Sequence, residues 1–300
     1  MLFRITPAGS LVRQDARDRV SRVNDAIKRL LDPFCRGAKR PVGQNPARPA
    51  GMLADDEEAY TVFEGTGLRL EELADDLPEG SHQDPGGIFR IRLAESHSSR
   101  RHAGMLVMRR YSFRGYRTKS VQTDPRLFTF VAYDLGRLVG TVSLRFDSKE
   151  GLAADELYRP ELDSLRQQGI RLCEFTRLAV DVSVGSKRVL AALFHTAYLL
   201  AHRIQYCDGA VIEVNPRHVV FYRRALAFEP VGPERMSPRV NAPAVLLYVS
   251  FSRIADGLAK YAGKPELAAS THFLFPYGFS SLEEVGILGR LKALGDSRRG

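Results

Sequence analysis

One stretch of ten residues limits what this chain can fold into more than any other. Residues 172–181 read LCEFTRLAVD, an apolar run that Glu174 and Arg177 interrupt. Such a run is typical of a strand in a protein core. A charged carboxyl group inside it costs free energy unless it is paired or has a chemical use. Glu174 is therefore the first candidate for a catalytic residue.

The segments around this strand predict an α/β fold. A short loop is followed by a long apolar helix that opens at Ser186, then by a strand over residues 210–214 and by Asn215-Pro216 at the start of another helix. Strands that alternate with helices in this way are typical of α/β proteins. Further strands are predicted over residues 88–93, 127–133, 138–146 and 244–251, a tight turn over residues 134–137, and helices over residues 96–116, 252–261 and 281–294 and from Pro160.

Composition along the chain indicates three parts. Residues 11–32 form an amphipathic pattern, residues 33–51 are rich in Pro, Gly and Arg, and residues 75–87 hold a second Pro and Gly cluster. The amphipathic helix fits packing against its own domain, or peripheral contact with a membrane surface. We expect an N-terminal extension, a catalytic domain and a C-terminal helical extension, over residues 1–87, 88–251 and 252–300.

Charge and cysteine content narrow the class of protein. The formal net charge of +9 attracts acidic partners. The chain has no zinc-finger spacing and no RNA-binding aromatic signature, so we expect no nucleic-acid partner. Three scattered cysteines predict free thiols and no metal site. No apolar run reaches the length of a membrane span and the N-terminus has no secretory pattern, so we expect a cytoplasmic protein.

Three segments carry a resemblance to known families. LVGTVSLR at residues 138–145 and NPRHVVFYRRALAF at residues 215–228 resemble the GCN5-related N-acetyltransferase fold, although the interval from Tyr222 to Phe228 is one residue longer than usual. EFTRLAV at residues 174–180 resembles the acid-x-x-arginine motif of acyl-homoserine-lactone synthases, a branch of that fold. Together with residues 109–116 and 240–250, the pattern resembles the N-acyl amino acid synthase family, the long-chain N-acyl tyrosine synthases.

The resemblance implies a mixed, mostly antiparallel central sheet flanked by helices. It also implies an N-acyltransferase that moves a long-chain acyl group from acyl carrier protein to the amino group of an amino acid. The co-substrate is acyl-phosphopantetheine or acyl-CoA, with no tightly bound cofactor. Two alternatives stay open: a coenzyme A-dependent N-acetyltransferase, and a non-catalytic module that binds acyl groups or the carrier protein.

The phosphate-binding segment departs from the common acetyltransferases. Those enzymes bind the coenzyme A pyrophosphate with a glycine-rich loop at a helix N-terminus. Here DVSVGSKRVL, residues 181–190, has one glycine, Gly185, followed by Ser186, Lys187 and Arg188. This segment is predicted to bind a single phosphate, as in phosphopantetheine on an acidic carrier protein.

Glu174 and Tyr222 are the predicted acid–base residues. A buried carboxyl group has a raised pKa, which suits Glu174 as the base that deprotonates the attacking amine. Its alternative is a structural ion pair with Arg177. In a regular strand these two residues face opposite sides, so only a β-bulge would bring them together. A bulge would also direct N–H groups near Leu178 and Val180 at the thioester carbonyl.

The remaining site residues are predicted from resemblance and residue type. By resemblance Tyr222 protonates the departing thiolate, and packing against Phe221 is its alternative. Asn215 caps the following helix or contacts the pantetheine arm. A bidentate arginine suits the carboxylate of an amino acid acceptor. The candidates for that contact are Arg145, Arg177 and Arg239. His195, Tyr198 and His202 share one side of the long helix and are predicted to be packing or surface residues.

Overall fold

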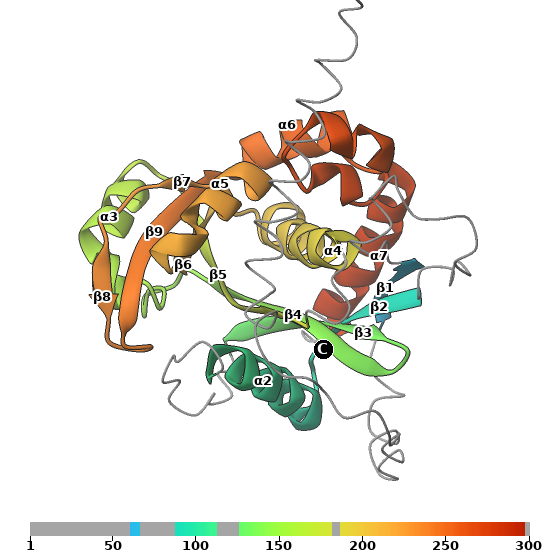
Figure 1. Cartoon of the computed structure of the whole chain (residues 1–300), viewed down its shortest axis with the longest axis horizontal. Coiled ribbons are helices and arrows are strands. Elements are labelled where there is room, and N and C mark those ends of the chain that lie inside the picture. The colour runs from blue at the N-terminus through green and yellow to red at the C-terminus, as the bar shows by residue number, and fades with distance from the viewer. Residues whose placement is uncertain (1–60, 67–87, 113–125, 182–186, 298–300) are drawn as a thin grey trace, which may run out of the picture.

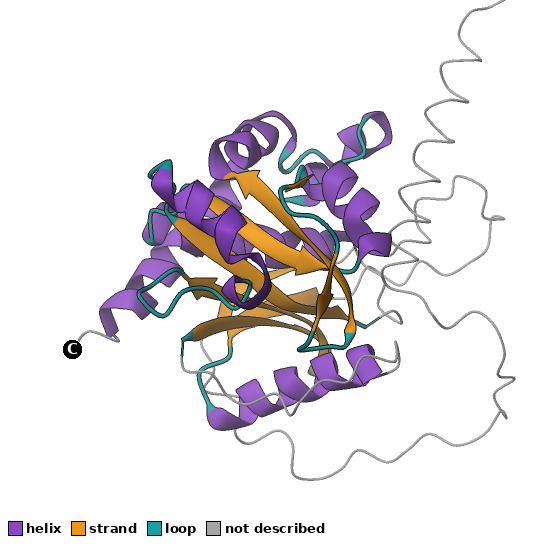
Figure 2. Cartoon of the chain, turned by 90° about the vertical axis from the view of Figure 1, so that its left-hand side faces the viewer, coloured by secondary structure: helices purple, strands orange, loops and turns teal. Residues whose placement is uncertain are grey.

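The computed structural model describes residues 61–66, 88–112, 126–181 and 187–297. In these residues nine strands form a sheet in the order β1-β2-β3-β4-β5-β6-β9-β7, with β8 paired to β9. Helices lie on both sides of this sheet (Figure 1, Figure 2). The strands are β1 (Thr61–Thr66), β2 (Ile88–Leu93), β3 (Leu127–Asp134), β4 (Arg137–Phe146), β5 (Leu172–Val180), β6 (Gly209–Val214), β7 (Glu229–Pro230), β8 (Arg235–Ser237) and β9 (Ala242–Ser250).

Strand direction confirms the predicted fold class. The β5–β6 pair is parallel, and the other described pairs are antiparallel. The predicted tight turn between β3 and β4 is also confirmed, because Leu135 and Gly136 have φ angles of 48° and 76°. The helices are α2 (His97–Ser112), α3 (Asp155–Gln167), α4 (Lys187–Tyr198), the π-helix η2 (Leu199–Ile204), η3 (Pro216–His218), α5 (Val219–Leu226), α6 (Phe251–Tyr261), η4 (Pro265–Ser270), η5 (Phe275–Tyr277) and α7 (Ser281–Ser297).

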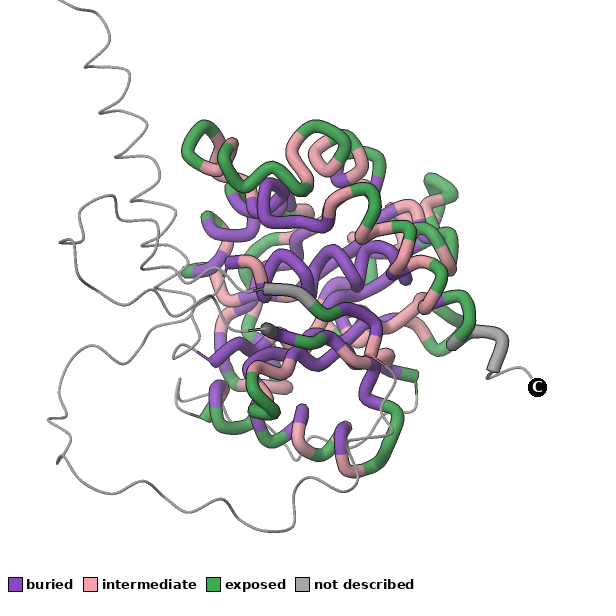
Figure 3. Tube along the Cα trace, turned by 90° about the vertical axis from the view of Figure 1, so that its right-hand side faces the viewer, coloured by how far each residue is buried: buried purple, intermediate pink, exposed green. Residues whose placement is uncertain are grey.

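Alternate side chains of β5 point to opposite faces of the sheet and pack against different helices. Leu172 packs in a cluster with Tyr158 and Leu162 of α3, and Ala179 packs with residues of α2. Phe175 points to the other face, into the main core that contains α4. Every residue of α4 except Arg188 is buried. Buried residues therefore gather between the sheet and the helices (Figure 3), with α2 and α3 on one face and α4 on the other.

The first strand, β1, lies before residue 87 and belongs to the same sheet. β1 pairs with β2 along the edge of the sheet, and Val62 and Phe63 are 0% and 3% exposed. The C-terminal segment is also part of the core, since Phe279 and Ile287 belong to the main hydrophobic cluster. A domain cut at residue 87 would lose an edge strand, which short-range patterns in the sequence do not reveal.

Deletion of residues 1–53 is expected to leave a folded domain, because the first described core residues follow Thr61. The free energy of unfolding, measured in urea, should change by no more than about 0.5 kcal/mol. A second deletion, of residues 1–66, is the control, and it should be much less stable because it removes β1. Aggregation of the shorter deletion would contradict the prediction.

The predicted amphipathic helix over residues 11–32 and the linker after it lie outside the described residues. Within the part of the chain that the structure describes, no helix combines the length and the apolar character needed to cross a bilayer.

Candidate active site

The candidate site lies where β5 and β6 separate. Their parallel pairing covers three residue pairs and ends at Glu174 and Val211, after which the two strands separate (Figure 1). A cavity of about 460 Å³ lies at this opening. Residues of α2, β5, β6 and α5 and of the segment between β8 and β9 line it. The chain therefore places an open cleft directly beside the acid that stands out in its sequence.

β5 contains a β-bulge between Glu174 and Ala179, in the region where the sequence analysis considers one. Ala179 pairs with Thr141 and Thr176 pairs with Ser143, so β5 has one residue more than β4 over this interval. Arg177 lies at the bulge with a φ angle of 53°, a left-handed conformation that costs a non-glycine residue free energy. The bulge turns the strand where Leu178 and Val180 line the cavity.

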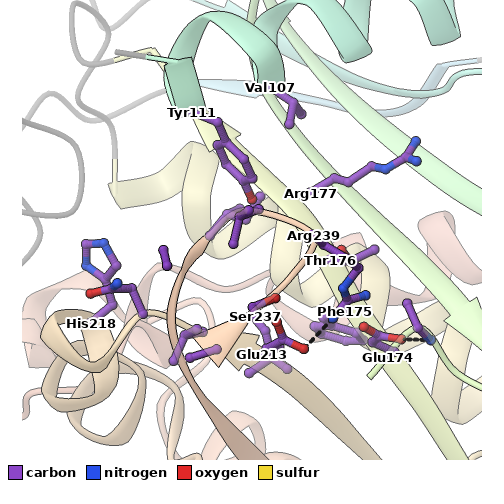
Figure 4. A pocket seen from close by; sticks show the side chains of 18 of the residues that line it. Val107, Tyr111, Glu174, Phe175, Thr176, Arg177, Glu213, His218, Ser237 and Arg239 are labelled. Carbon is purple, nitrogen blue, oxygen red and sulfur yellow. Dashed lines mark hydrogen bonds and ion pairs between the residues drawn. The ribbon is translucent and has the colours of Figure 1, made fainter. Parts of the chain in front are cut away.

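Glu174 is buried at the closed end of the cleft, with 2% of its surface exposed. Its Oε2 accepts hydrogen bonds from the backbone N–H groups of Ala153, at 2.6 Å, and Ala154, at 3.3 Å, just before α3 (Figure 4). Burial raises the pKa of Glu174, against the positive charges of Arg239 and Arg145 and the two amide hydrogen bonds, which lower it. A buried carboxylate of this kind is suited to accept a proton.

Glu174 does not form the ion pair with Arg177 that was the structural alternative. Within the described residues its hydrogen bonds go to the amides of Ala153 and Ala154. Figure 4 shows the Arg177 side chain pointing away from Glu174. The bulge therefore does not bring the two charges together, and Glu174 instead fixes the turn that leads into α3.

The cleft has one polar wall and one apolar wall. Arg145 is paired in register with Glu174, so the two side chains share the face that α2 and α3 cover. On β6, Glu213 alternates with Ile212 and Val214, which point into the main core. The apolar wall is completed by Phe175, Val180 and Tyr222, which also belong to that core and line the cavity.

Arg145, Arg177 and Arg239, the predicted contacts for an acceptor carboxylate, all line the cavity. Arg239 is already held by two acids. Its Nη2 donates a hydrogen bond to Glu213, and its Nε lies 3.5 Å from an oxygen of Glu156. Glu213 is not among the predicted site residues, although the lone acid in GAVIEV is the same signal as the lone acid in LCEFTRLAV.

Tyr222 and Asn215 lie at the far side of the cleft. The Tyr222 ring is buried, lines the cavity and makes edge contacts with Phe194, Phe221 and Phe228 at centroid distances of 6.4, 5.2 and 6.0 Å. Asn215 caps η3 as predicted, because its Oδ1 accepts from the N–H of Arg217 at 3.3 Å. Its amide nitrogen donates to the carbonyl of Pro243 at 3.0 Å, which ties the cap to β9.

Two of the predicted phosphate-binding residues do not line the cavity. Lys187 is buried over the Tyr277 ring, 5.3 Å from its centroid, and burial lowers its pKa to about 8. Arg188 donates to the carbonyls of Tyr277 and Gly278 at 2.8 and 2.6 Å and to Glu283 at 2.6 Å. Arg188 therefore holds the C-terminal segment. Gly185 and Ser186 lie outside the described residues.

The histidine side of α4 packs as predicted. His195 stacks on Phe279, its Nδ1 accepts from the Phe279 N–H at 3.0 Å, and Tyr198 stacks on His202. Cys173 and Cys207 are buried free thiols, and Cys35 lies outside the described residues. The described residues contain no group of His, Cys, Asp and Glu side chains arranged to hold a metal ion.

The nine-stranded sheet has one parallel pair, which opens beside a bulged strand, and this arrangement is the GCN5-related N-acetyltransferase fold. Residues 102–250, just under half of the chain, match the family described as N-acyl amino acid synthase FeeM. The structure of FeeM, from uncultured soil microbes, is 27% identical with a TM-score of 0.51, over 55% of this chain and 93% of that one.

Two further solved structures are similar at lower identity. An N-acetyltransferase from Staphylococcus aureus is 13% identical with a TM-score of 0.39, over 55% of this chain and 98% of that one. The coenzyme A-dependent acyl-homoserine lactone synthase BjaI is 15% identical with a TM-score of 0.39, over 52% of this chain and 76% of that one. No curated protein matches the chain.

Proposed function

We propose that this protein transfers a long-chain acyl group from acyl carrier protein to the amino group of an amino acid. The observation that carries the proposal is the cleft between β5 and β6, which has Glu174 at its closed end, a polar wall on one side and an apolar wall on the other. A polar amine and an apolar acyl chain would meet in such a cleft. The similarity to FeeM, an N-acyl amino acid synthase, supports the same reaction.

The proposed reaction needs one base, one acid and a site for the oxyanion. Glu174 takes a proton from the acceptor ammonium group, and the neutral amine attacks the thioester carbonyl. A C–N bond forms while the carbonyl oxygen becomes an oxyanion, which N–H groups at the bulge near Leu178 stabilise. The C=O bond then re-forms as the C–S bond breaks, and the departing thiolate takes the hydroxyl proton of Tyr222, which lines the same cavity. The new amide nitrogen gives up its extra proton to the Tyr222 phenolate, so the products are a neutral amide and a thiol.

The apolar wall supports a long acyl chain. Phe175, Val180, Ile212 and Val214 give it no hydrogen-bonding side chains, and a second cavity of about 30 Å³ lies behind Phe175 and Phe194. Burial of hydrocarbon contributes about 0.8 kcal/mol per methylene. A donor with a long chain should therefore bind much more tightly than an acetyl donor.

The surface of α2 supports a carrier-protein donor. Arg101, Met105, Met108 and Arg109 are exposed along the helix, and α2 lines the cleft with other residues. Near its end, Arg109 and Arg137 face the single acid Asp181 at 3.7 and 2.7 Å. An excess of positive charge with exposed methionine side chains fits an acidic partner protein.

A screen of donors and acceptors, analysed by mass spectrometry, tests this function. The purified protein would receive palmitoyl carrier protein, palmitoyl-CoA or acetyl-CoA, each with the common amino acids, and heat-denatured protein would be the control. We expect an N-palmitoyl amino acid, formed fastest from the carrier protein. Faster reaction with palmitoyl-CoA would reject the donor, and an acetylated product alone would reject the long-chain reaction.

A further inference from the structure

The closed end of the cleft is surrounded by three acids, Glu156, Glu174 and Glu213, and by two arginines, Arg145 and Arg239. Arg239 comes from the segment between β8 and β9, Glu213 from β6 and Glu156 from α3, and all three side chains line the same cavity as Glu174. Figure 4 shows Arg239 between Glu213 and Glu174. The Glu213 side chain is only 11% exposed, so its hydrogen bond to Arg239 lies largely away from water.

We propose that Glu213 and Arg239 form a positioning pair for Glu174, in which Glu213 holds the guanidinium of Arg239 where its positive charge stabilises the ionised Glu174. The inference rests on the proposed role of Glu174 as the base. Arg239 then stabilises the charge of the base Glu174 and does not bind the carboxylate of the acceptor. Glu213 acts only by holding Arg239 in position.

The partners of Arg239 argue against its use as a clamp for the acceptor. A guanidinium binds a carboxylate best when two N–H groups on one edge are available. In Arg239, Nη2 donates to Glu213 and Nε lies 3.5 Å from Glu156. A substrate carboxylate would have to displace one of these acids, and the displaced Glu213 would stay largely buried without its counter-charge.

The electrostatics of Glu174 support the same assignment. A carboxylate that is removed from water needs compensating charge or hydrogen bonds to stay ionised. Among the interactions that lower the pKa of Glu174, the charge of Arg239 is the largest, ahead of the amides of Ala153 and Ala154 and of Arg145. The other charged or titratable side chains on the cavity wall are those of Arg110, Tyr111, Arg177, His218 and Tyr222, in addition to Glu156 and Glu213.

The pH dependence of kcat/KM separates the positioning role from a clamp. In the wild type, kcat/KM should rise with pH as Glu174 loses its proton, and this rise is the acidic limb of the pH profile. Arg239→Gln removes a positive charge and so raises the pKa of Glu174. The limb should therefore move to higher pH by about 1 unit or more. Glu213→Gln removes a nearby negative charge, while the glutamine oxygen can still accept the hydrogen bond that Arg239 donates. Arg239 should then stay in place, and the rise in activity should move to lower pH. Opposite shifts would not follow from general damage to the fold. If Arg239 is a clamp, Arg239→Gln should instead raise KM for the acceptor at every pH.

The chain offers a matched control for these variants. Arg235 and Glu161 form a similar ion pair between β8 and α3, at 2.6 Å, and neither residue lines the cavity. Arg235→Gln should therefore leave the position of the pH limb unchanged.

A second measurement needs no turnover. The Glu174 carboxyl group can be titrated by infrared difference spectroscopy of protein labelled with carbon-13 glutamate, with its band assigned by loss in Glu174→Gln. Its midpoint should rise in Arg239→Gln and stay unchanged in Arg235→Gln. An unchanged midpoint in Arg239→Gln would overturn the positioning pair, whether or not the enzyme is active. A wild-type protein that acylates no amino acid would instead count against the proposed function.

Discussion

Replacement of Glu174 by glutamine is expected to lower kcat/KM for N-acyl amino acid formation by about 10²- to 10⁴-fold, the usual contribution of a general base. Glutamine has nearly the same shape, and its side-chain oxygen can still accept the hydrogen bond that the Ala153 N–H donates at 2.6 Å. The fold should therefore persist while proton transfer is lost. The measurement is kcat/KM over a range of pH, together with urea unfolding of the same preparation.

Glu161→Gln is the control for this substitution, because Glu161 lies on α3 and does not line the cavity. Its kcat/KM should stay close to that of the wild type. Full activity of Glu174→Gln would refute the role of Glu174 as base. A variant that unfolds would instead assign Glu174 to the turn before α3.

Replacement of Arg188 by methionine is expected to lower the free energy of unfolding by about 1–3 kcal/mol, the usual cost of leaving hydrogen-bonding groups without their partner. The guanidinium bonds two carbonyls and Glu283, and it also lies 5.6 and 5.7 Å from the ring centroids of Phe63 and Phe279. One side chain thus joins the start of α4 to β1 and to the segment that leads into α7. Methionine keeps much of the apolar contact but satisfies none of these acceptors.

Arg203→Met provides the comparison for Arg188→Met. Arg203 lies 3.6 Å from Glu284, and half of its side chain is exposed. Exposed pairs of this kind contribute about 0–1 kcal/mol. Urea denaturation should therefore separate the two variants clearly, and equal small losses would show that Arg188 is not an anchor of the C-terminal segment.

Local patterns in the sequence were enough to predict the interior strands and the acid at the site. Alternation of apolar residues predicted residues 138–146 as a strand, which is β4 in the structure, and the lone acid in an apolar run singled out Glu174. The same criterion applied to residues 209–214 would have found Glu213. The helix expected from Pro160 instead begins at Asp155 and is kinked at Tyr158.

The features that sequence patterns could not predict depend on distant partners. Lys187 and Arg188 at a helix start fit a phosphate site. Their contacts are instead with a segment about ninety residues later, as the Arg188 hydrogen bond to Tyr277 over 89 positions shows. Likewise β1 is six residues long and becomes part of the core through distant partners such as β2 and α7. No local pattern in the sequence specifies either contact.

The contact between β1 and α7 also has a consequence for protein synthesis. Arg290 donates to the carbonyl of Val62 at 2.7 Å, a contact between residues 228 positions apart. On the ribosome, β1 emerges long before α7, and chains acquire structure from the N-terminus as they are made. Val62 and Phe63 therefore cannot complete their native contacts with α7 until nearly the whole chain has been translated. A stop codon before Arg290 would release a protein with its cleft residues complete and its edge strand uncovered, a form that cellular quality control would remove.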